Sequence, residues 1–272
     1  MLAPLLIAVA PNGARRDKND HPRLPVTIDE TAREAAACRE AGAAMLHLHV
    51  RDGSGRHVLD AGIYALAISA VRREAGNDLL IQVTSEAIGL YSPPQQMAVI
   101  DALAPEAVSI ALRELAPDDA SLPRAAAFLE AHARRGTLIQ YIIYDLADLA
   151  RFESLFSRGV IPERGASQIF VLGRYAEGQL SSPLDLLPFL RERKRGLPWM
   201  VCAFGPREIA TASAAAALEG HARVGFENNL WRPDGSLAQD NAVQIADLAE
   251  IAQRIGRRLV SPEEARKVLS GA

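Results

Sequence analysis

The chain has 272 residues, of which 49% are hydrophobic and 23% are charged, and its formal net charge is −3. This composition supplies a large core and excludes the basic surface typical of nucleic-acid binding, and no apolar run approaches the roughly 20 residues of a membrane span. The two cysteines, Cys38 and Cys202, are too few and too far apart for a disulfide framework, so we expect a soluble, cytoplasmic protein.

Short apolar runs alternate with longer helical patterns from one end of the chain to the other. The runs predicted as strands are Leu5–Ala10, Met45–Val50, Leu79–Thr84, Ala107–Ala111, Thr137–Tyr144, Gln168–Leu172, Trp199–Phe204 and Ala222–Glu227. The helical stretches between them include Ile28–Ala41, Gly62–Glu74, Arg124–Arg134, Leu184–Arg195, Pro206–Leu218 and Asn241–Ile255. Capping-box patterns at Thr27-Ile-Asp-Glu30 and Ser261-Pro-Glu-Glu264 mark two helix starts.

Strands that alternate with helices predict parallel pairing, and eight such units close naturally into a barrel. A doubly wound sheet is the alternative, but no G-x-G-x-x-G motif follows the first strand. We therefore predict a single (β/α)8 (TIM) barrel domain over residues 1–272. The helix that starts after Ser261 is predicted to be an extra C-terminal helix packed on the outside.

The second strand carries two histidines. Side chains alternate across a strand, so Leu46, Leu48 and Val50 share one face, and His47 and His49 share the other. The apolar face must pack on the outer helices, which points both histidines into the barrel at the carboxyl end, where active sites of this fold form. The H-x-H spacing favours a shared metal ion, and a hydrogen-bonded pair of core histidines is the alternative.

The eighth strand adds a carboxylate by the same alternation. Val224 and Phe226 are predicted to face the helices, so Arg223, Gly225 and Glu227 face inward. A carboxylate inside a barrel is costly unless it is paired or bound to a cation. We therefore predict that Glu227 joins the two histidines in a site suited to zinc, or to iron or manganese. An ion pair with Arg223 is the alternative.

Other strand ends contribute hydroxyl and amide groups that are predicted to hold a substrate carboxylate or carbonyl. The residues predicted in this role are Asn12, Thr84, Ser109 and Tyr141. Two basic segments, residues 15–18 and Gly173-Arg174, either bind an anion or are solvated. Of the other histidines, His57 and His221 are predicted to be structural, and His132 is predicted to lie on the surface.

Several segments together resemble the β-keto acid cleavage enzymes, also described as 3-keto-5-aminohexanoate cleavage enzymes. The segments are Ala10-Pro-Asn-Gly-Ala-Arg-Arg16, Asp20-His-Pro-Arg-Leu-Pro-Val-Thr27, Gly42-Ala-Ala-Met-Leu-His-Leu-His-Val-Arg-Asp52, Gln82-Val-Thr84 and Gly220-His-Ala-Arg-Val-Gly-Phe-Glu-Asn-Asn229. They span both ends of the chain. The resemblance implies a (β/α)8 barrel that holds one Zn²⁺ on His47, His49 and Glu227.

The resemblance also implies a reaction in which a β-keto acid and acetyl-CoA give acetoacetate and a new CoA thioester. Zinc would chelate the β-keto oxygen and the carboxylate of the substrate and stabilise the enolate as a Lewis acid. Arg223 matches the family's arginine in the strand-eight motif, and an inward arginine offers its charge to the oxyanions. We expect the chain to bind these two small molecules and to form a homo-oligomer, either a tetramer or a dimer.

Two positions depart from the family's pattern. The family typically has an Asp directly after the metal-binding Glu, where this chain has Asn228, and it tends to carry a Glu on strand five, which Gln140-Tyr-Ile-Ile-Tyr-Asp145 lacks. The position of Asn228 predicts a catalytic role, because it matches the family's Asp. An amide, however, cannot act as a base near pH 7. Zinc-bound hydroxide or a loop carboxylate, such as Asp145 or Glu86, must take the α-proton. We expect Asn228→Asp to speed proton removal.

Two other functions are compatible with the sequence. A zinc hydrolase of the amidohydrolase type would also place His-x-His in a barrel, but it usually needs further inward histidines, and no other histidine lies within a predicted strand. A metal-dependent, ligand-binding paralogue that has lost catalysis is the second alternative, and Asn228 motivates it.

Overall fold

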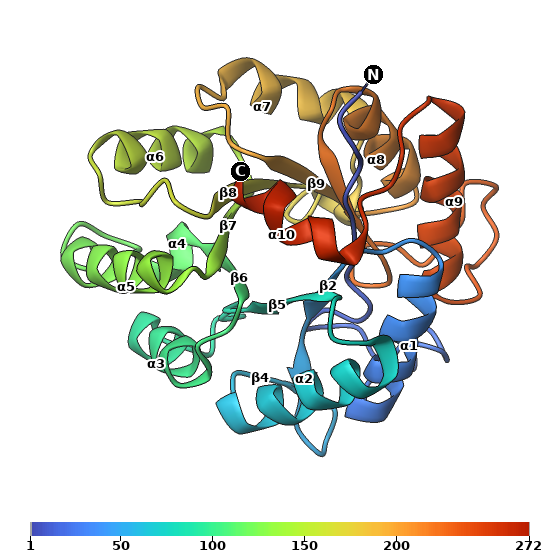
Figure 1. Ribbon diagram of the computed structural model, residues 1–272, viewed down its shortest axis with the longest axis horizontal. Helices are drawn as coiled ribbons and strands as arrows, with labels where there is room; N and C mark the ends of the chain where they lie inside the picture. Colours follow the sequence, from blue (N-terminus) through green and yellow to red (C-terminus); the bar gives the residue numbers. More distant parts are fainter. Residues whose placement is uncertain (1, 272) are drawn as a thin grey trace.

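The computed structural model describes residues 2–271, which form a closed barrel of parallel strands with helices around it (Figure 1). The barrel strands are β1 (Ile7–Val9), β2 (Met45–Leu48), β5 (Leu80–Thr84), β6 (Ala107–Ala111), β7 (Leu138–Ile143), β8 (Ala166–Leu172), β9 (Trp199–Ala203) and β10 (His221–Val224). They follow one another in chain order, and β1 closes the ring by pairing with β10. The predicted (β/α)8 barrel is confirmed. A short antiparallel hairpin, β3 (Val50–Arg51) with β4 (His57–Val58), follows β2.

Helices connect the strands and cover the outside of the barrel. They are α1 (Ile28–Glu40), α2 (Ala61–Ala75), α3 (Pro93–Leu103), α4 (Leu112–Leu115), α5 (Leu122–Arg135), α6 (Leu146–Ser157), α7 (Leu186–Glu192), α8 (Glu208–Ala217), α9 (Asn241–Arg254) and α10 (Pro262–Ser270), with 3-10 turns η1 (Glu177–Gln179) and η2 (Pro183–Asp185). The ends of most predicted helices agree with the observed ends within two residues. The predicted Leu184–Arg195 helix, however, is divided between η2 and α7. Among residues 2–271, no helix combines the length and apolar character that crossing a bilayer requires.

Alternation along each strand separates an interior layer from an outer one. The interior layer is built mainly from small or flexible apolar side chains, such as Ala8, Met45, Leu80, Ala107 and Met200. The outer layer packs against the helices and is richer in branched side chains, such as Ile7, Leu46, Ile81, Val108 and Val201. Toward the carboxyl ends of the strands the interior becomes polar, and there Gln82 Nε2 donates to Gln140 Oε1 at 3.2 Å. This polar end is where the candidate site lies.

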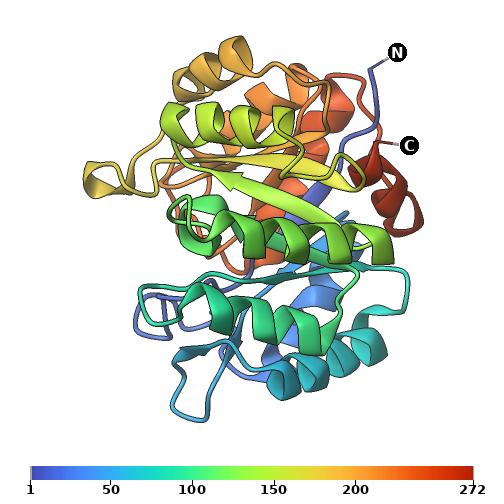
Figure 2. The same cartoon turned by 90° about the vertical axis from the view of Figure 1, so that its left-hand side faces the viewer.

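The helix α10 closes the amino end of the barrel, so the expectation that it packs on the outside is wrong. Its Ala265 and Leu269 belong to the interior cluster of the barrel. Arg266 pairs with Glu106 at 2.7 Å and donates to the carbonyl of Asp78 at 2.7 Å. Figure 2 shows α10 at one end of the barrel and the long loops at the opposite end. The small interior side chains leave room that the apolar face of α10 fills.

The last barrel strand is shorter than predicted, because it ends at Val224 rather than at Glu227. Gly225 has a φ of +141°, and a Cβ at this position would lie 2.5 Å from the carbonyl oxygen of Ala10. The chain therefore leaves the sheet at this glycine. The turn formed by residues 225–229 begins here and carries Glu227 over the carboxyl end of the barrel.

Candidate active site

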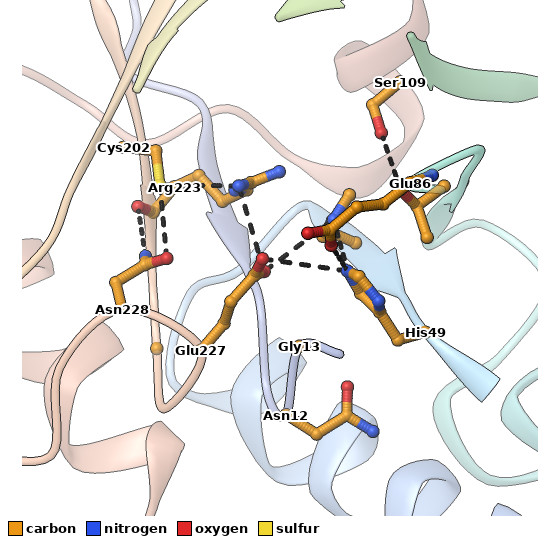
Figure 3. Close-up of polar contacts among 12 residues, drawn as sticks. Asn12, Gly13, His49, Glu86, Ser109, Cys202, Arg223, Glu227 and Asn228 are labelled. Atoms are coloured by element: carbon orange, nitrogen blue, oxygen red, sulfur yellow. Dashed lines mark hydrogen bonds and ion pairs between the residues drawn. The ribbon is translucent and has the colours of Figure 1, made fainter. Parts of the chain in front are cut away.

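The three predicted metal ligands meet at the carboxyl end of the barrel. His47 Nε2 lies 3.1 Å from His49 Nε2, and each of these nitrogens lies 3.7 Å from a carboxylate oxygen of Glu227. One ligand atom from each residue falls within 4.8 Å of the others. All three side chains are largely removed from solvent, with 2%, 0% and 12% of their surfaces exposed. Figure 3 shows Glu227 and His49 pointing toward each other.

Hydrogen bonds determine which nitrogen of each histidine carries the proton. His47 Nδ1 lies 2.8 Å from Gln82 Oε1, and because a carbonyl oxygen only accepts, Nδ1 is the protonated nitrogen. His57 Nε2 donates to the carbonyl oxygen of Glu86 at 3.1 Å, which leaves His57 Nδ1 to accept from His49 Nδ1 at 3.5 Å. Both Nε2 atoms that face each other therefore carry lone pairs.

This set of donors fits a divalent cation. Burial, followed by the charge of Arg223, lowers the pKa of His47 well below its ordinary value, and burial does the same for His49, so both rings are neutral. Burial acts to raise the pKa of Glu227, but the positive charges of Arg223 and, more weakly, Arg174 keep it below its usual value. Glu227 Oε2 has no hydrogen-bond partner. Two lone pairs and an unpartnered carboxylate oxygen repel one another unless a cation lies among them, and two His with one carboxylate suit zinc.

The loop after β1 closes over Glu227. Gly13 has a φ of +59°, and a Cβ at this position would lie 2.6 Å from Glu227 Cγ, so only glycine leaves the carboxylate in place. Arg51 of β3 anchors this loop, since its Nη2 donates to the carbonyls of Gly13 at 2.8 Å and Arg16 at 2.6 Å. Arg16 Nη1 in turn donates to the carbonyl of Phe226 at 2.6 Å. The basic loop therefore holds the turn that carries Glu227.

Arg223 faces inward, as predicted, and most of its hydrogen-bonding capacity is unused. Its Nη2 lies 3.8 Å from Glu227 Oε2 and 3.4 Å from Cys202 Sγ. Nε and Nη1 have no partner, although the residue is only 3% exposed. Unpaired buried donors are costly. Arg223 lines a pocket, called here the central pocket, whose polar lining is His47, Thr84, Glu86, Tyr144, Arg174, Arg223 and Glu227. Its guanidinium is placed to bind an anionic group there.

Three of the predicted substrate-binding residues lie beside this pocket. Thr84 lines it, and Ser109 Oγ donates to Thr84 Oγ1 from behind at 3.4 Å. Asn12 lines an adjoining pocket together with Glu227. Asn12 Nδ2 donates to the carbonyl of Pro25 at 3.0 Å, whereas its Oδ1 has no partner. Their use by a substrate stays a prediction.

Tyr141 does not reach the central pocket, which corrects its predicted role. It faces outward from β7 and belongs to the layer between strands and helices. Its ring packs against Phe152 of α6 with the centroids 5.2 Å apart. The inward positions of this strand include Gln140, which bonds to Gln82, and Ile142, which lines the central pocket.

The other histidines lie outside the metal-binding cluster. His57, as noted, bonds to His49 and therefore supports a metal ligand. His221 Nδ1 accepts from the backbone N–H of Leu6 at 3.1 Å, near the amino end of the barrel. The prediction that His132 lies on the surface is wrong, because it is fully buried and its Nε2 lies 2.9 Å from Asp101 Oδ1 of α3.

Asn228 faces away from the central pocket. It is fully buried, its Nδ2 donates to Glu208 Oε1 at 3.0 Å, and its Oδ1 accepts from Cys202 Sγ at 3.2 Å. Glu208 Oε1 also accepts from the backbone N–H of Gly225 at 3.0 Å. The structure therefore gives Asn228 a role in holding the turn in place of the predicted catalytic role. It also removes the reason to expect that Asn228→Asp speeds proton removal.

Instead, we expect Asn228→Asp to lower the free energy of unfolding by about 1–3 kcal/mol, because a carboxylate would replace the amide donor that faces Glu208. Burial already raises the pKa of Glu208 to about 8. In the double variant with Glu208→Gln, an amide again faces a carboxyl group, whose oxygen accepts its hydrogen bond, and most of the lost stability should return. Denaturant unfolding of the four proteins measures this. An additive, undiminished loss in the double variant would show that the two side chains do not interact.

Comparisons of the sequence with known proteins all point to one enzyme family. The sequence model of a family described as beta-keto acid cleavage enzyme matches residues 4–270. The chain is 28% identical over 288 residues to the 3-keto-5-aminohexanoate cleavage enzyme of Fusobacterium nucleatum subsp. nucleatum, covering 99% of each protein. It is 26% identical over 282 residues to the 3-oxoadipate:acetyl-CoA acetyltransferase of Cupriavidus necator, covering 99% of this chain and 95% of that protein.

Among solved structures, the apo structure of ObcA superimposes with a TM-score of 0.72 at 17% sequence identity. The match covers 91% of this chain and 65% of that chain, so this chain spans about two thirds of the solved protein. The likeness supports the barrel fold.

Proposed function

The chain belongs to the beta-keto acid cleavage enzyme family, and from this premise we propose that it is a zinc-dependent enzyme that acts on a β-keto acid and acetyl-CoA. The products would be acetoacetate and a new CoA thioester. The relatives named for cleavage of 3-keto-5-aminohexanoate and for acetyl transfer from acetyl-CoA to 3-oxoadipate support this reaction class. One observation of the structure carries the proposal. A cluster of metal-ligand type and a guanidinium with unused donors line the same pocket.

A β-keto acid matches this arrangement because its ketone carbon and its carboxylate carbon are two bonds apart, so the ketone oxygen and the carboxylate can both reach the same site. His47, His49 and Glu227 would hold the metal, and zinc when bound would supply a Lewis acid that favours negative charge on the ketone oxygen. Arg223 would bind the substrate carboxylate or the charge that develops during reaction through Nε and Nη1. Arg174 adds a second positive charge to the pocket wall.

A hydrolase of the amidohydrolase type is not supported by the arrangement of the histidines. That function would need further histidines directed at the metal. His57 is the next histidine along from the pair, and its Nε2 is already committed to the carbonyl of Glu86 while its Nδ1 faces His49. It therefore orients a ligand and does not add one.

The test is to incubate the zinc-loaded protein with acetyl-CoA and a panel of short β-keto acids that differ in length and charge. We expect at least one acid to give acetoacetate and a new CoA thioester in equal amounts, which mass spectrometry of the thioesters identifies. If acids bind to the protein but none of them yields acetoacetate, the proposal fails and a ligand-binding paralogue is the better description.

A further inference from the structure

The reaction needs a base for the α-proton, and the described residues place two carboxylates on the wall of the central pocket. They are Glu227 and Glu86. Glu227 directs its oxygens at the two histidines and at Arg223. Glu86 follows β5 and enters the pocket from a different element, and Figure 3 shows the two carboxylates converging from different sides of the site. Glu86 is therefore the carboxylate of this pocket that the metal-binding cluster leaves unused.

Asp145, which the sequence also offered as a base, and Glu208, which is buried near the site, are both held elsewhere. Asp145 is exposed, its Oδ2 pairs with Arg113 at 2.6 Å, and its Oδ1 caps α6 by accepting from the N–H of Asp148 at 2.8 Å. Glu208 lies beneath the turn of residues 225–229 and bonds to Asn228 there. Neither residue lines the central pocket.

Glu86 is held firmly by its backbone, while its carboxylate is held loosely. Its N–H donates to Thr84 Oγ1 at 3.1 Å, and its carbonyl accepts from His57 Nε2 at 3.1 Å. The carboxylate makes one hydrogen bond, a long one of 3.4 Å from Arg174 Nη2 to Oε1, and Oε2 lies 3.9 Å from His49 Nε2. A fixed backbone with an available oxygen is the arrangement that a general base requires.

From this geometry we propose that Glu86 is the general base that removes the α-proton of the β-keto acid. This inference rests on the proposed function. The α C–H bond breaks, an O–H bond forms on Glu86, and the electron pair stays on the substrate as an enolate. The enolate carbon attacks the acetyl-CoA carbonyl and displaces CoA thiolate, which then attacks the original ketone. Cleavage of the C–C bond releases the new thioester and the acetoacetate carbanion, which takes the proton back from Glu86.

The test is deuterium exchange at the substrate α-carbon in heavy water without acetyl-CoA, corrected for exchange of the free acid. We expect Glu86→Gln to lower the exchange rate by about 100-fold or more, while metal content and the Kd for the β-keto acid stay within about threefold of wild type. Asp145→Asn is the matched control and should exchange at the wild-type rate, since Asn also caps a helix well. Glu86→Ala should regain exchange when formate, a small carboxylate, is added.

Three results would overturn the proposal. If Glu86→Gln exchanges nearly as fast as wild type, another group takes the proton. If Glu86→Gln loses metal together with exchange, Glu86 is a ligand of the cation rather than the base. If wild type itself shows no exchange above background, Glu86 has no such role. In this last case, acetoacetate formation with acetyl-CoA decides separately whether the proposed function fails as well.

Discussion

Replacing both His47 and His49 by glutamine should remove bound metal and turnover together. The two Nε2 atoms and Glu227 form the donor cluster, and glutamine provides no nitrogen lone pair that can bind a cation. Metal content should fall from about one equivalent per chain to almost none, because a catalytic zinc site uses three protein ligands. Loss of the Lewis acid removes several kcal/mol of transition-state stabilisation, so acetoacetate formation should fall by about 1,000-fold or more.

The matched control is His132→Gln, which changes another buried histidine that lies in α5 and bonds to Asp101. It should keep metal and turnover. Elemental analysis of the purified proteins, read for all divalent metals, measures the result. Full occupancy in the double variant would exclude this cluster as the metal site.

Arg223→Met should lower turnover by about 100- to 1,000-fold while leaving metal content unchanged. The change removes the guanidinium whose Nε and Nη1 are unpartnered in the pocket, and loss of one preorganised donor to a developing charge has effects of about this size. The metal should stay, because His47, His49 and Glu227 are intact. Methionine also fills most of the space that the arginine occupied.

Arg266→Met, at the opposite end of the barrel, is the control for loss of a partly buried arginine. Turnover and metal content of each variant are measured in parallel. A fall in metal that matches the fall in turnover would mean that Arg223 supports the metal site rather than the substrate.

The pattern of elements could be read from the sequence because each strand is an apolar run between helical stretches. The inward direction of His47 and Arg223 could also be read, since the leucines and valines beside them show which face meets the helices. Tyr141 could not be placed in this way. Strand β7 is buried on both faces, as parallel strands are. Its run of apolar residues therefore does not show which side chains face the barrel interior and which face the helices.

Glu227 lies at the predicted end of the barrel, but it lies in a turn and not in the strand that was predicted. Alternation of Val224 and Phe226 suggested a strand through Glu227, whereas Gly225 adopts a positive φ and ends it. The end point is the same because the turn folds back over the barrel. A glycine inside an apparent strand is the signal that would have shown this.

The roles of the residues around the metal ligands could not be predicted from the sequence, because their contacts join segments that are distant along the chain. Glu208 looks like an acidic residue in the first turn of a helix, and its burial depends on residues 225–229. His57 is a histidine in a loop until the β3–β4 hairpin brings it to His49. Glu86 and Asp145 were equivalent in the sequence, and only the fold separates a pocket residue from an exposed helix cap.

The proposed transfer is tested most directly by following the acetyl carbons. The enzyme is given acetyl-CoA with both acetyl carbons labelled as carbon-13, together with an unlabelled β-keto acid that the enzyme accepts. The proposed reaction places the label in the ketone and methyl carbons of acetoacetate and leaves the new CoA thioester unlabelled. Unlabelled acetoacetate, or label in the new thioester, would contradict acetyl transfer at this site.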